Sequence, residues 1–356
     1  MPCLNAAEVF TDTKPLKVGL VGCGGRGLGA MKNALDADPG TMVWALADVF
    51  QERIDFGAKL LAEQYGNRAQ LDRSRLFSGL DSYKRLLQTD IDVVLLCTPP
   101  AFRPEHLAAA IDASKHIYAE KPVAVDVPGV LSVLESARLA KLKNLVILDG
   151  FCWRYDKANE EAHRKLSSGL LGRVLSFDGL YYTTPPKSPL ALDSRPSSDT
   201  DVAWALRNWT AWNWLSGGQF VEQIVHTIDG MVWSMNEQLP LAAFGSGGRA
   251  QRRDDGDVWD HYDVYFEYDH NVTAHISCRQ WVGCHGEIVD RTICEKGMLV
   301  TPYRPYIQAN NRWRFRGERG NMYADTHVAF YRSCAPAPGP RHWKARPINP
   351  GCHHGA

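Results

Sequence analysis

The sequence of 356 residues has no excess of charge of either sign, because 40 Lys and Arg residues balance 40 Asp and Glu residues. A surface that binds nucleic acid or an anionic membrane needs a basic excess, so the composition argues against both kinds of partner. The sequence also lacks the run of about 18 apolar residues that a bilayer-spanning helix requires. Its length suffices for two domains, and its hydrophobic content of 45% is ordinary for a globular protein.

Cysteine is present without a metal-binding or disulfide pattern. The nine cysteines are scattered, and no two have the Cys-x-x-Cys spacing typical of a zinc site. Their odd number fits reduced thiols better than a disulfide framework. The first residues lack the basic and apolar segments of a secretion signal. We therefore expect a cytoplasmic protein without a metal site, although an export signal already removed would leave the same sequence.

The N-terminal part of the chain has the element order of a dinucleotide-binding unit. An apolar run at 16–21 predicts a buried strand, and Gly-x-Gly-x-x-Gly follows at 22–27. Residues 28–35 read as a helix, and a second apolar run at 42–47 ends on Asp48. A glycine-rich turn by itself is often only a tight loop without a ligand, but this combination of strand, turn, helix, strand and acid is typical of nucleotide binding.

Each glycine of the motif has a physical role. Gly22 permits the tight turn out of the strand, and Gly24 lets the backbone approach a pyrophosphate closely. Gly27 allows the helix to pack against the strand, and the unpaired N–H groups at the helix start hold the phosphates. Gly25 and Arg26 complete the loop, so we expect all five residues to contact the cofactor.

Asp48 indicates which cofactor the protein prefers. A carboxylate at the end of the second strand accepts hydrogen bonds from the adenosine ribose hydroxyls and repels a 2′-phosphate. The sequence therefore favours NAD over NADP, with Arg53 nearby as the residue that opposes this preference.

Strands and helices alternate from residue 16 to about residue 150, which predicts a parallel, doubly wound sheet. Ligands of such sheets bind beyond the carboxyl ends of the strands. Three further segments follow strands and should reach the same crevice: residues 98–100, with Thr98 and Pro99; residues 120–122, which read Glu-Lys-Pro; and residues 149–155.

After residue 150 the pattern becomes mainly β. Alternating residues predict strands at 173–183, 258–268 and 271–279 and a hairpin at 288–301, with a helix at 219–235. We expect a C-terminal α+β domain that has a mainly antiparallel open sheet and one or two helices.

The pattern divides the chain into four parts. We expect a leader over residues 1–15 and a nucleotide-binding Rossmann domain over residues 16–150. A substrate-binding and oligomerisation domain should follow over residues 151–333, and residues 334–356 form a proline-rich tail.

Two groups of polar residues are candidates for catalysis. Lys121 lies between Glu120 and Pro122 at a strand end, where an ammonium can bind a substrate hydroxyl, although a surface lysine in an ion pair is the commoner case. Glu222 and His226 are four residues apart on one helix face, so the carboxylate can orient an imidazole that accepts a proton. A structural helix histidine bonded to a neighbouring acid would have the same spacing.

Together these motifs resemble those of the Gfo/Idh/MocA oxidoreductases. The shared features are the glycine loop, Asp48, Glu120-Lys121-Pro122 and the later pattern Gly217-Gly218-x3-Glu222-x3-His226-x2-Asp229. The resemblance implies a Rossmann domain joined to an open-faced sheet, and hydride transfer between NAD(P) and a sugar or cyclitol carbon. By position it makes Lys121 and His226 catalytic, with Glu222 where the family has Asp. It also makes Glu120 and Lys121 neighbours of the cofactor.

Several other residues are expected beside a carbohydrate substrate. Trp153, Arg154 and Tyr155 follow the last strand of the nucleotide-binding domain and should face the crevice. Trp209 offers a flat surface for a sugar ring, although packing of its loop explains it equally well. Asp229 lies near the helix face that carries the catalytic histidine.

The sequence favours an NAD-dependent dehydrogenase that acts on a sugar, glycoside or cyclitol, and two other functions stay open. The resemblance also covers enzymes that hold NAD⁺ tightly and cleave glycosides by transient oxidation and elimination, for which Lys121 and His226 would serve equally. A non-catalytic NAD-binding regulator is the third function, and the presence of both residues argues against it. We expect a homodimer or homotetramer that associates through the open sheet.

Overall fold

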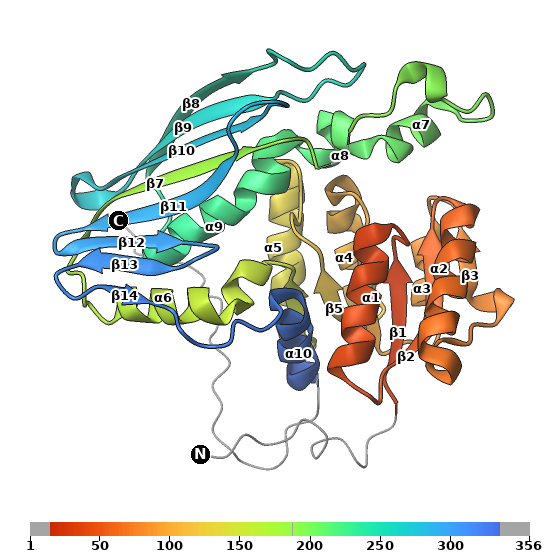
Figure 1. The fold of residues 1–356 in the computed structure, drawn as a ribbon. Coiled ribbons are helices and arrows are strands. Elements are labelled where there is room, and N and C mark those ends of the chain that lie inside the picture. Colours follow the sequence, from red (N-terminus) through yellow and green to blue (C-terminus); the bar gives the residue numbers. More distant parts are fainter. Residues whose placement is uncertain (1–14, 187, 335–356) are drawn as a thin grey trace, which may run out of the picture.

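A computed structural model describes residues 15–186 and 188–334 of the chain. These residues form two sheets, each with helices packed against it (Figure 1). Within the described residues, no helix combines the length and the apolar composition that crossing a membrane requires.

The first sheet has six parallel strands in the order β3-β2-β1-β4-β5-β6, which confirms the predicted doubly wound arrangement. Its strands are β1 (Lys17–Val21), β2 (Met42–Asp48), β3 (Leu76–Ser78), β4 (Val93–Leu96), β5 (His116–Ala119) and β6 (Ile147–Asp149). The helices between them are α1 (Gly25–Ala37), α2 (Gln51–Tyr65), α3 (Ser82–Leu87), α4 (Arg103–Asp112) and α5 (Val127–Leu142). The central strands are almost entirely apolar because helices cover both faces.

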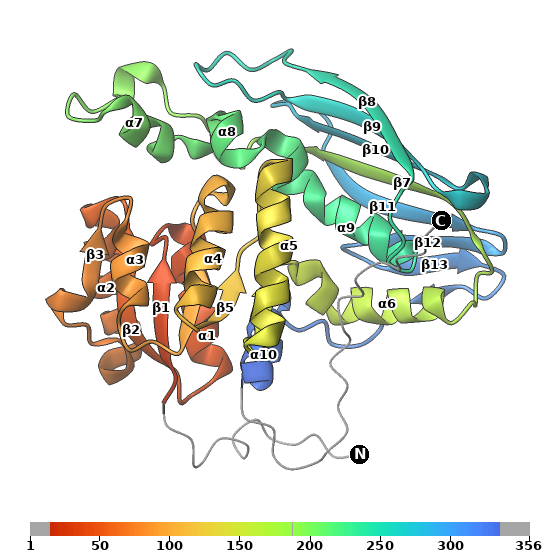
Figure 2. The ribbon, with the colours of Figure 1, turned by 180° about the vertical axis from the view of Figure 1, so that it is seen from behind.

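The last described helix, α10 (Met322–Cys334), returns to this first sheet. It packs beside α1 and α2 on one face, while α3, α4 and α5 cover the other face (Figures 1 and 2). Phe330 is fully buried, and the His327 ring stacks on Tyr118 of β5 with 4.1 Å between ring centroids. The end of the described chain thus completes the core around the first sheet, which the sequence analysis did not predict.

The second sheet has eight strands in the order β14-β13-β12-β11-β7-β10-β9-β8. Only β7 and β10 pair in parallel, so the prediction of a mainly antiparallel sheet is confirmed. Its strands are β7 (Val174–Thr183), β8 (Ala242–Gly248), β9 (His261–Glu267), β10 (Thr273–Gln280), β11 (Glu287–Cys294), β12 (Gly297–Thr301), β13 (Tyr306–Ala309) and β14 (Trp313–Arg314).

The C-terminal part has more helices than the one or two expected. Its described residues form five: α6 (Lys157–Ser167), α7 (Asp201–Arg207), α8 (Asn213–Ser216), α9 (Val225–Ser234) and α10. Helices α6 and α9 cover one face of the second sheet. Helices α7 and α8 have seven and four residues, too few to give a clear helical period in the sequence.

The helix expected at 219–235 is divided into two kinds of helix. Residues Phe220–Ile224 form a π-helical turn (η8), and the regular helix α9 begins at Val225. A π-helix bonds residues five apart instead of four, so residues four apart no longer lie directly above one another. The division therefore changes which side chains Glu222 and His226 can reach.

Four histidines are buried within the part of the chain that the structure describes. His106, His163, His226 and His327 are at most 9% exposed. Burial, helped by a nearby Arg or Lys charge in each case, lowers the pKa of each imidazole to about 3. These side chains are neutral near pH 7, whereas a histidine in the unfolded chain binds a proton at a pH near about 6.5.

We predict that the free energy of unfolding falls as the pH drops from about 6.5 toward 3, because the unfolded chain binds protons that the folded protein excludes. The variant His163→Phe isolates one such group and keeps a ring against Trp233, 3.7 Å away between ring centroids. The free energy of unfolding, measured with urea, should decrease between pH 7 and pH 5 by about 2 kcal/mol less in this variant than in the wild type. His285 is exposed, so the control variant His285→Phe should show the same decrease in the free energy of unfolding as the wild type. Equal losses in wild type and His163→Phe would contradict the prediction.

Candidate active site

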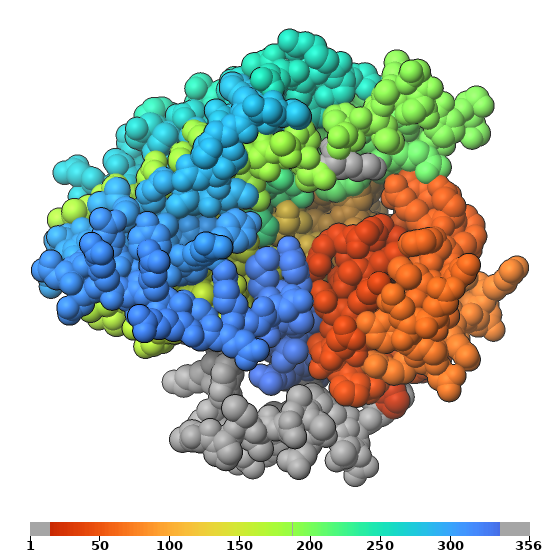
Figure 3. Space-filling model, viewed as in Figure 1, coloured from red at the N-terminus to blue at the C-terminus, as the bar shows by residue number. Residues whose placement is uncertain are grey.

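A cavity of about 190 Å³ lies at the carboxyl ends of β1, β2 and β4. Its wall contains the residues expected from the sequence to contact a cofactor there: Gly22, Gly24, Gly25, Arg26, Gly27, Asp48, Thr98 and Pro99. Figure 3 shows the surface hollowed between the N-terminal part, in red and orange, and the green segment above it. The structure thus brings these residues together, although Glu120 and Lys121 do not line this cavity.

The glycine loop provides the space that a dinucleotide needs. Gly22 has φ +99°, and a Cβ there would lie 2.7 Å from the carbonyl group of Cys97. A Cβ at Gly27 would lie 1.8 Å from the carbonyl oxygen of Gly22, so both positions require glycine. A Cβ at Gly24 or Gly25 would meet nothing within 4 Å, and α1 has no acidic residue in its first turn. The open loop and the helix N-terminus therefore fit a pyrophosphate.

Asp48 has a structural role besides the one expected. Its carboxylate accepts hydrogen bonds from the backbone N–H groups of Cys23, at 2.7 Å, and Phe50, at 3.0 Å. These bonds fix the glycine loop against the end of β2. Arg53 lines the same cavity, with its guanidinium 4.7 Å from the centre of the Phe50 ring. The acid expected to favour NAD and the base expected to oppose that preference therefore line one cavity.

Arg103 and His106 of α4 belong to this region and were not recognised in the sequence. Arg103 is 2% exposed and donates to the carbonyl oxygens of Thr98 and Pro122, so it ties together the segments after β4 and β5. Burial lowers its pKa to about 10. His106 lines the cavity, with Nδ1 3.2 Å from the Thr98 hydroxyl. Neither residue belongs to a motif, so only the folded chain reveals them.

Residues of the C-terminal part close the cavity from above. Leu206 and Trp209 line it, and Arg207 pairs with Glu52 of α2 at 2.7 Å. The Arg207 guanidinium also lies 3.9 Å from the centre of the Phe50 ring. Trp209, expected beside the substrate, therefore lines the same cavity as the glycine loop, because α7 and the turn after it fold over the N-terminal part.

Lys121 meets Glu222 across the two parts of the chain. Its ammonium lies 3.0 Å from Glu222 Oε1 and donates to the Glu222 carbonyl oxygen at 2.5 Å. The two side chains are only 17% and 19% exposed. Behind Lys121, the buried carboxylate of Glu120 accepts a hydrogen bond from Arg26 at 2.7 Å, which fixes the end of β5.

His226 lies in the first turn of α9 and is 9% exposed. Its ring stacks on Trp153 with 4.8 Å between centroids and meets the edge of Phe151 at 6.0 Å. Burial and, to a smaller extent, the charge of Lys121 lower its pKa to about 3. Nδ1 is buried and has no hydrogen-bond partner among the described residues. The expected pairing of Glu222 with His226 is wrong, because the π-helical turn directs Glu222 to Lys121.

Two of the other residues expected beside the substrate, Arg154 and Asp229, form a separate group. Arg154 pairs with Asp229 and with Glu237, each at 2.8 Å. Tyr155 is half-buried, and burial reinforced by the charge of Asp149 raises its pKa to about 12. Arg154 and Asp229 thus bind each other, while Trp153 supports the ring of His226.

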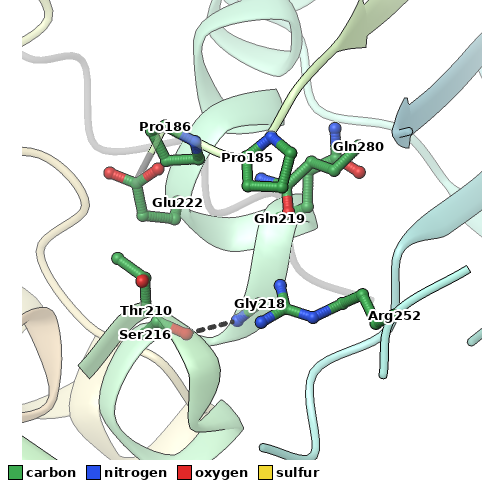
Figure 4. Close-up of a pocket in the computed structure, with 9 residues that line it drawn as sticks. All are labelled: Pro185, Pro186, Thr210, Ser216, Gly218, Gln219, Glu222, Arg252 and Gln280. Carbon is green, nitrogen blue, oxygen red and sulfur yellow. Dashed lines mark hydrogen bonds between the residues drawn. The ribbon is translucent and has the colours of Figure 1, made fainter. Parts of the chain in front are cut away.

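This geometry is suited to handling a proton at a carbinol oxygen. Glu222 occupies two of the three N–H donors of the Lys121 ammonium and leaves one for a ligand oxygen. The neutral imidazole of His226 has an acceptor nitrogen. Glu222 also lines a second, small cavity with Gln219 and Arg252 (Figure 4).

Comparison with known proteins gives matches to both parts of the chain. Residues 16–147 match the oxidoreductase family Gfo/Idh/MocA with its NAD-binding Rossmann fold, and residues 159–323 match the Gfo/Idh/MocA C-terminal domain.

Individual relatives are more distant. A dTDP-3,4-didehydro-2,6-dideoxy-alpha-D-glucose 3-reductase of Actinomadura kijaniata is 28% identical over 49% of this chain and 48% of its own. A glycosyl hydrolase family 109 protein of Streptomyces coelicolor is 32% identical over 48% of this chain and 35% of its own. The chain spans about half the length of the first curated relatives it matches.

The fold also matches a solved structure. KijD10, a 3-ketoreductase from Actinomadura kijaniata in complex with NADP and TDP-benzene, has a TM-score of 0.66 and 22% identity over 90% of each chain. The two domain matches together cover most of the described residues and agree with the motifs in the sequence. The chain belongs to the Gfo/Idh/MocA family of oxidoreductases.

Proposed function

We propose that the protein is an NAD-dependent oxidoreductase that transfers a hydride between the nicotinamide cofactor and a secondary hydroxyl or ketone of a sugar or sugar derivative. The observation that carries the proposal is the Lys121–Glu222 contact, which joins the strand ends of the nucleotide-binding part to the helix that holds His226. Membership of the family and the similarity to a sugar-nucleotide reductase support the same reaction class.

In this proposal Lys121 binds the reacting oxygen through its remaining N–H donor and stabilises the charge that develops there. His226 accepts the hydroxyl proton during oxidation and returns it during reduction. Glu222 is a positioning residue, because it holds the ammonium by both its carboxylate and its carbonyl oxygen. NAD⁺, when bound, supplies the hydride acceptor, and the glycine loop, Asp48 and Thr98 hold it.

A glycoside hydrolase that uses transient oxidation is the second candidate, favoured by the 32% identity to a glycosyl hydrolase family 109 protein. The two functions differ in whether turnover consumes NAD. A dehydrogenase forms NADH in proportion to the oxidised sugar, whereas the hydrolase cleaves a glycoside without net NADH. A regulator without catalysis is less favoured, because Lys121 and His226 are both present and lie in one region.

We also propose that the uncovered face of the second sheet joins copies of the chain into a homodimer or homotetramer. The rings of Phe244, Tyr265 and His275 stack in turn across β8, β9 and β10 on this face. Phe244 is 62% and Tyr265 42% exposed in the single chain. Exposed aromatic clusters of this kind are typical of protein interfaces.

We further propose that the two domains divide at about residue 150 and that the protein is cytoplasmic.

We predict that Lys121→Ala lowers kcat/KM by about 10³-fold or more while NADH still binds, because the stabilised charge at the reacting oxygen is lost. The control Lys141→Ala removes an exposed lysine of the same part of the chain and should behave as wild type. Turnover is followed by NADH absorbance with the best substrate of a sugar panel. Full activity of Lys121→Ala would exclude its catalytic role.

Replacing His226 by Ala should lower kcat/KM by about 10²-fold to 10⁴-fold. Because the pKa of His226 is about 3, the wild type should keep its proton acceptor throughout pH 5 to 9. Rates of both proteins are compared across that range, with circular dichroism to verify folding. If the variant matched the wild-type rate at every pH, another group would have to accept the proton.

The cofactor preference should follow Asp48. We predict that the wild type binds NADH at least about tenfold more tightly than NADPH, since the carboxylate repels the 2′-phosphate. Asp48→Asn should narrow this ratio and still accept the hydrogen bond from the Cys23 N–H. Arg53→Ala should weaken the binding of NADPH more than the binding of NADH. Fluorescence titration measures the affinity of all three proteins for both cofactors, and equal affinity of the wild type for NADH and NADPH would refute the preference.

A further inference from the structure

The second cavity, which shares Glu222 with the Lys121–Glu222 pair, contains polar groups that the proposed chemistry does not use. Its wall includes Gln219 just before the π-helical turn, Arg252 from the segment between β8 and β9, and Gln280 at the end of β10. Figure 4 shows these side chains around one space, together with Glu222. Segments distant in the sequence thus converge beside the residue that positions Lys121.

Gln219 is the first of the unused groups. It is 2% exposed, and neither the oxygen nor the nitrogen of its side-chain amide has a hydrogen-bond partner among the described residues. The neighbouring Gln280 differs, because its amide donates to Gln223 at 2.7 Å. A buried amide without partners is unfavourable, so native proteins rarely keep one without a water or ligand that completes it.

Arg252 is the second group. It is 9% exposed, and its Nε and Nη2 donate to Asp254 at 2.9 and 3.1 Å. Its backbone N–H donates to the buried carboxylate of Asp260 at 2.9 Å, which fixes the segment. Nη1 makes no hydrogen bond within residues 15–186 and 188–334, and the guanidinium lies toward Gly218 in Figure 4. Arg252 is therefore held rigidly, with one amino group left for a ligand.

The size and the polarity of the cavity select the ligand group. Its free space is about 10 Å³, close to that of one water molecule. Gln219 offers a donor and an acceptor, Arg252 offers donors, and Glu222 contributes a carboxylate. A hydroxyl both donates and accepts and satisfies this set. A carboxylate or phosphate only accepts, is larger, and would face the Gln219 oxygen and the negative charge of Glu222.

We propose that Gln219 and Arg252 bind a second hydroxyl of the substrate, distinct from the one that reacts, and thereby select neutral sugars or cyclitols over acidic and phosphorylated ones. This inference rests on the proposed oxidoreductase function, because Glu222 connects the cavity to Lys121. The bound hydroxyl sets the register of the sugar and so determines which carbon approaches Lys121.

The test uses the full chain with NAD⁺ and a panel of neutral sugars and cyclitols, each beside its acidic or phosphorylated counterpart. The kcat/KM for the best neutral substrate should be at least tenfold higher than for its acidic and phosphorylated counterparts. Gln219→Ala and Arg252→Ala should each lower kcat/KM for it by about 10-fold to 100-fold, with unchanged affinity for NADH. Two exposed residues give matched controls, Gln238→Ala and Arg253→Ala, which should behave as wild type.

Monodeoxy analogues of the best substrate separate recognition from a loss of structure. For one analogue the wild type should have a low kcat/KM, and Gln219→Ala should lower that value no further, because the missing hydroxyl and the amide act as a pair. If Gln219→Ala lowered kcat/KM equally for the parent sugar and every analogue, the inference would be overturned. A preference of the wild type for the acidic counterparts would also overturn it.

Binding distinguishes failure of the inference from failure of the proposed function. Titration calorimetry with the NAD-loaded protein measures the affinity for the same neutral sugars. A neutral sugar that binds without forming NADH, whose keto form does not consume NADH, and whose binding is lost in Gln219→Ala would refute the oxidoreductase and support the hydroxyl site. If no neutral sugar binds, the inference is wrong.

Discussion

The contact between Lys121 and Glu222 is the constraint on which the candidate site depends. It joins a strand end of the parallel sheet to a helical turn of the C-terminal part, 101 residues later in the chain. An ammonium at a flexible strand end would not be fixed relative to a ligand. Here it is bound by both the carboxylate and the carbonyl oxygen of one residue, so its third donor has a defined direction.

Both ends of this contact are held by buried polar groups. On the Rossmann side, Arg26 pairs with Glu120, and Arg103 binds the carbonyl oxygen of Pro122, so the residues on either side of Lys121 are fixed. On the other side, the π-helical turn shifts Glu222 away from His226 and toward Lys121. The packing of α10 against the first sheet connects the two parts at a second place. The relative position of the two parts is thus set by the same fold that forms the site.

In the proposed function, the two cavities recognise different parts of the ligands. The first has free space over Gly24 and Gly25 and is bounded by Leu206 of α7, which suits a long dinucleotide. The second is small and lined by groups that both donate and accept hydrogen bonds, which suits single hydroxyls. Lys121, Glu222 and His226 lie where the two parts meet. A neutral imidazole and a paired ammonium in this position favour exchange of a proton at an oxygen without a large buried net charge.

The sequence alone determined the features that local pattern encodes. The glycine loop, Asp48, the alternating strands and the Glu-Lys-Pro segment follow from spacing and periodicity, because each of their physical requirements is met within a short stretch of chain. Lys121 and His226 could be named for the same reason, through motifs. Only the tertiary structure decided that Glu222 binds Lys121 and that Trp209 faces the nucleotide cavity. It alone revealed Arg103, Gln219 and Arg252, because burial and hydrogen-bond partners arise from contacts between distant segments, which no local pattern records.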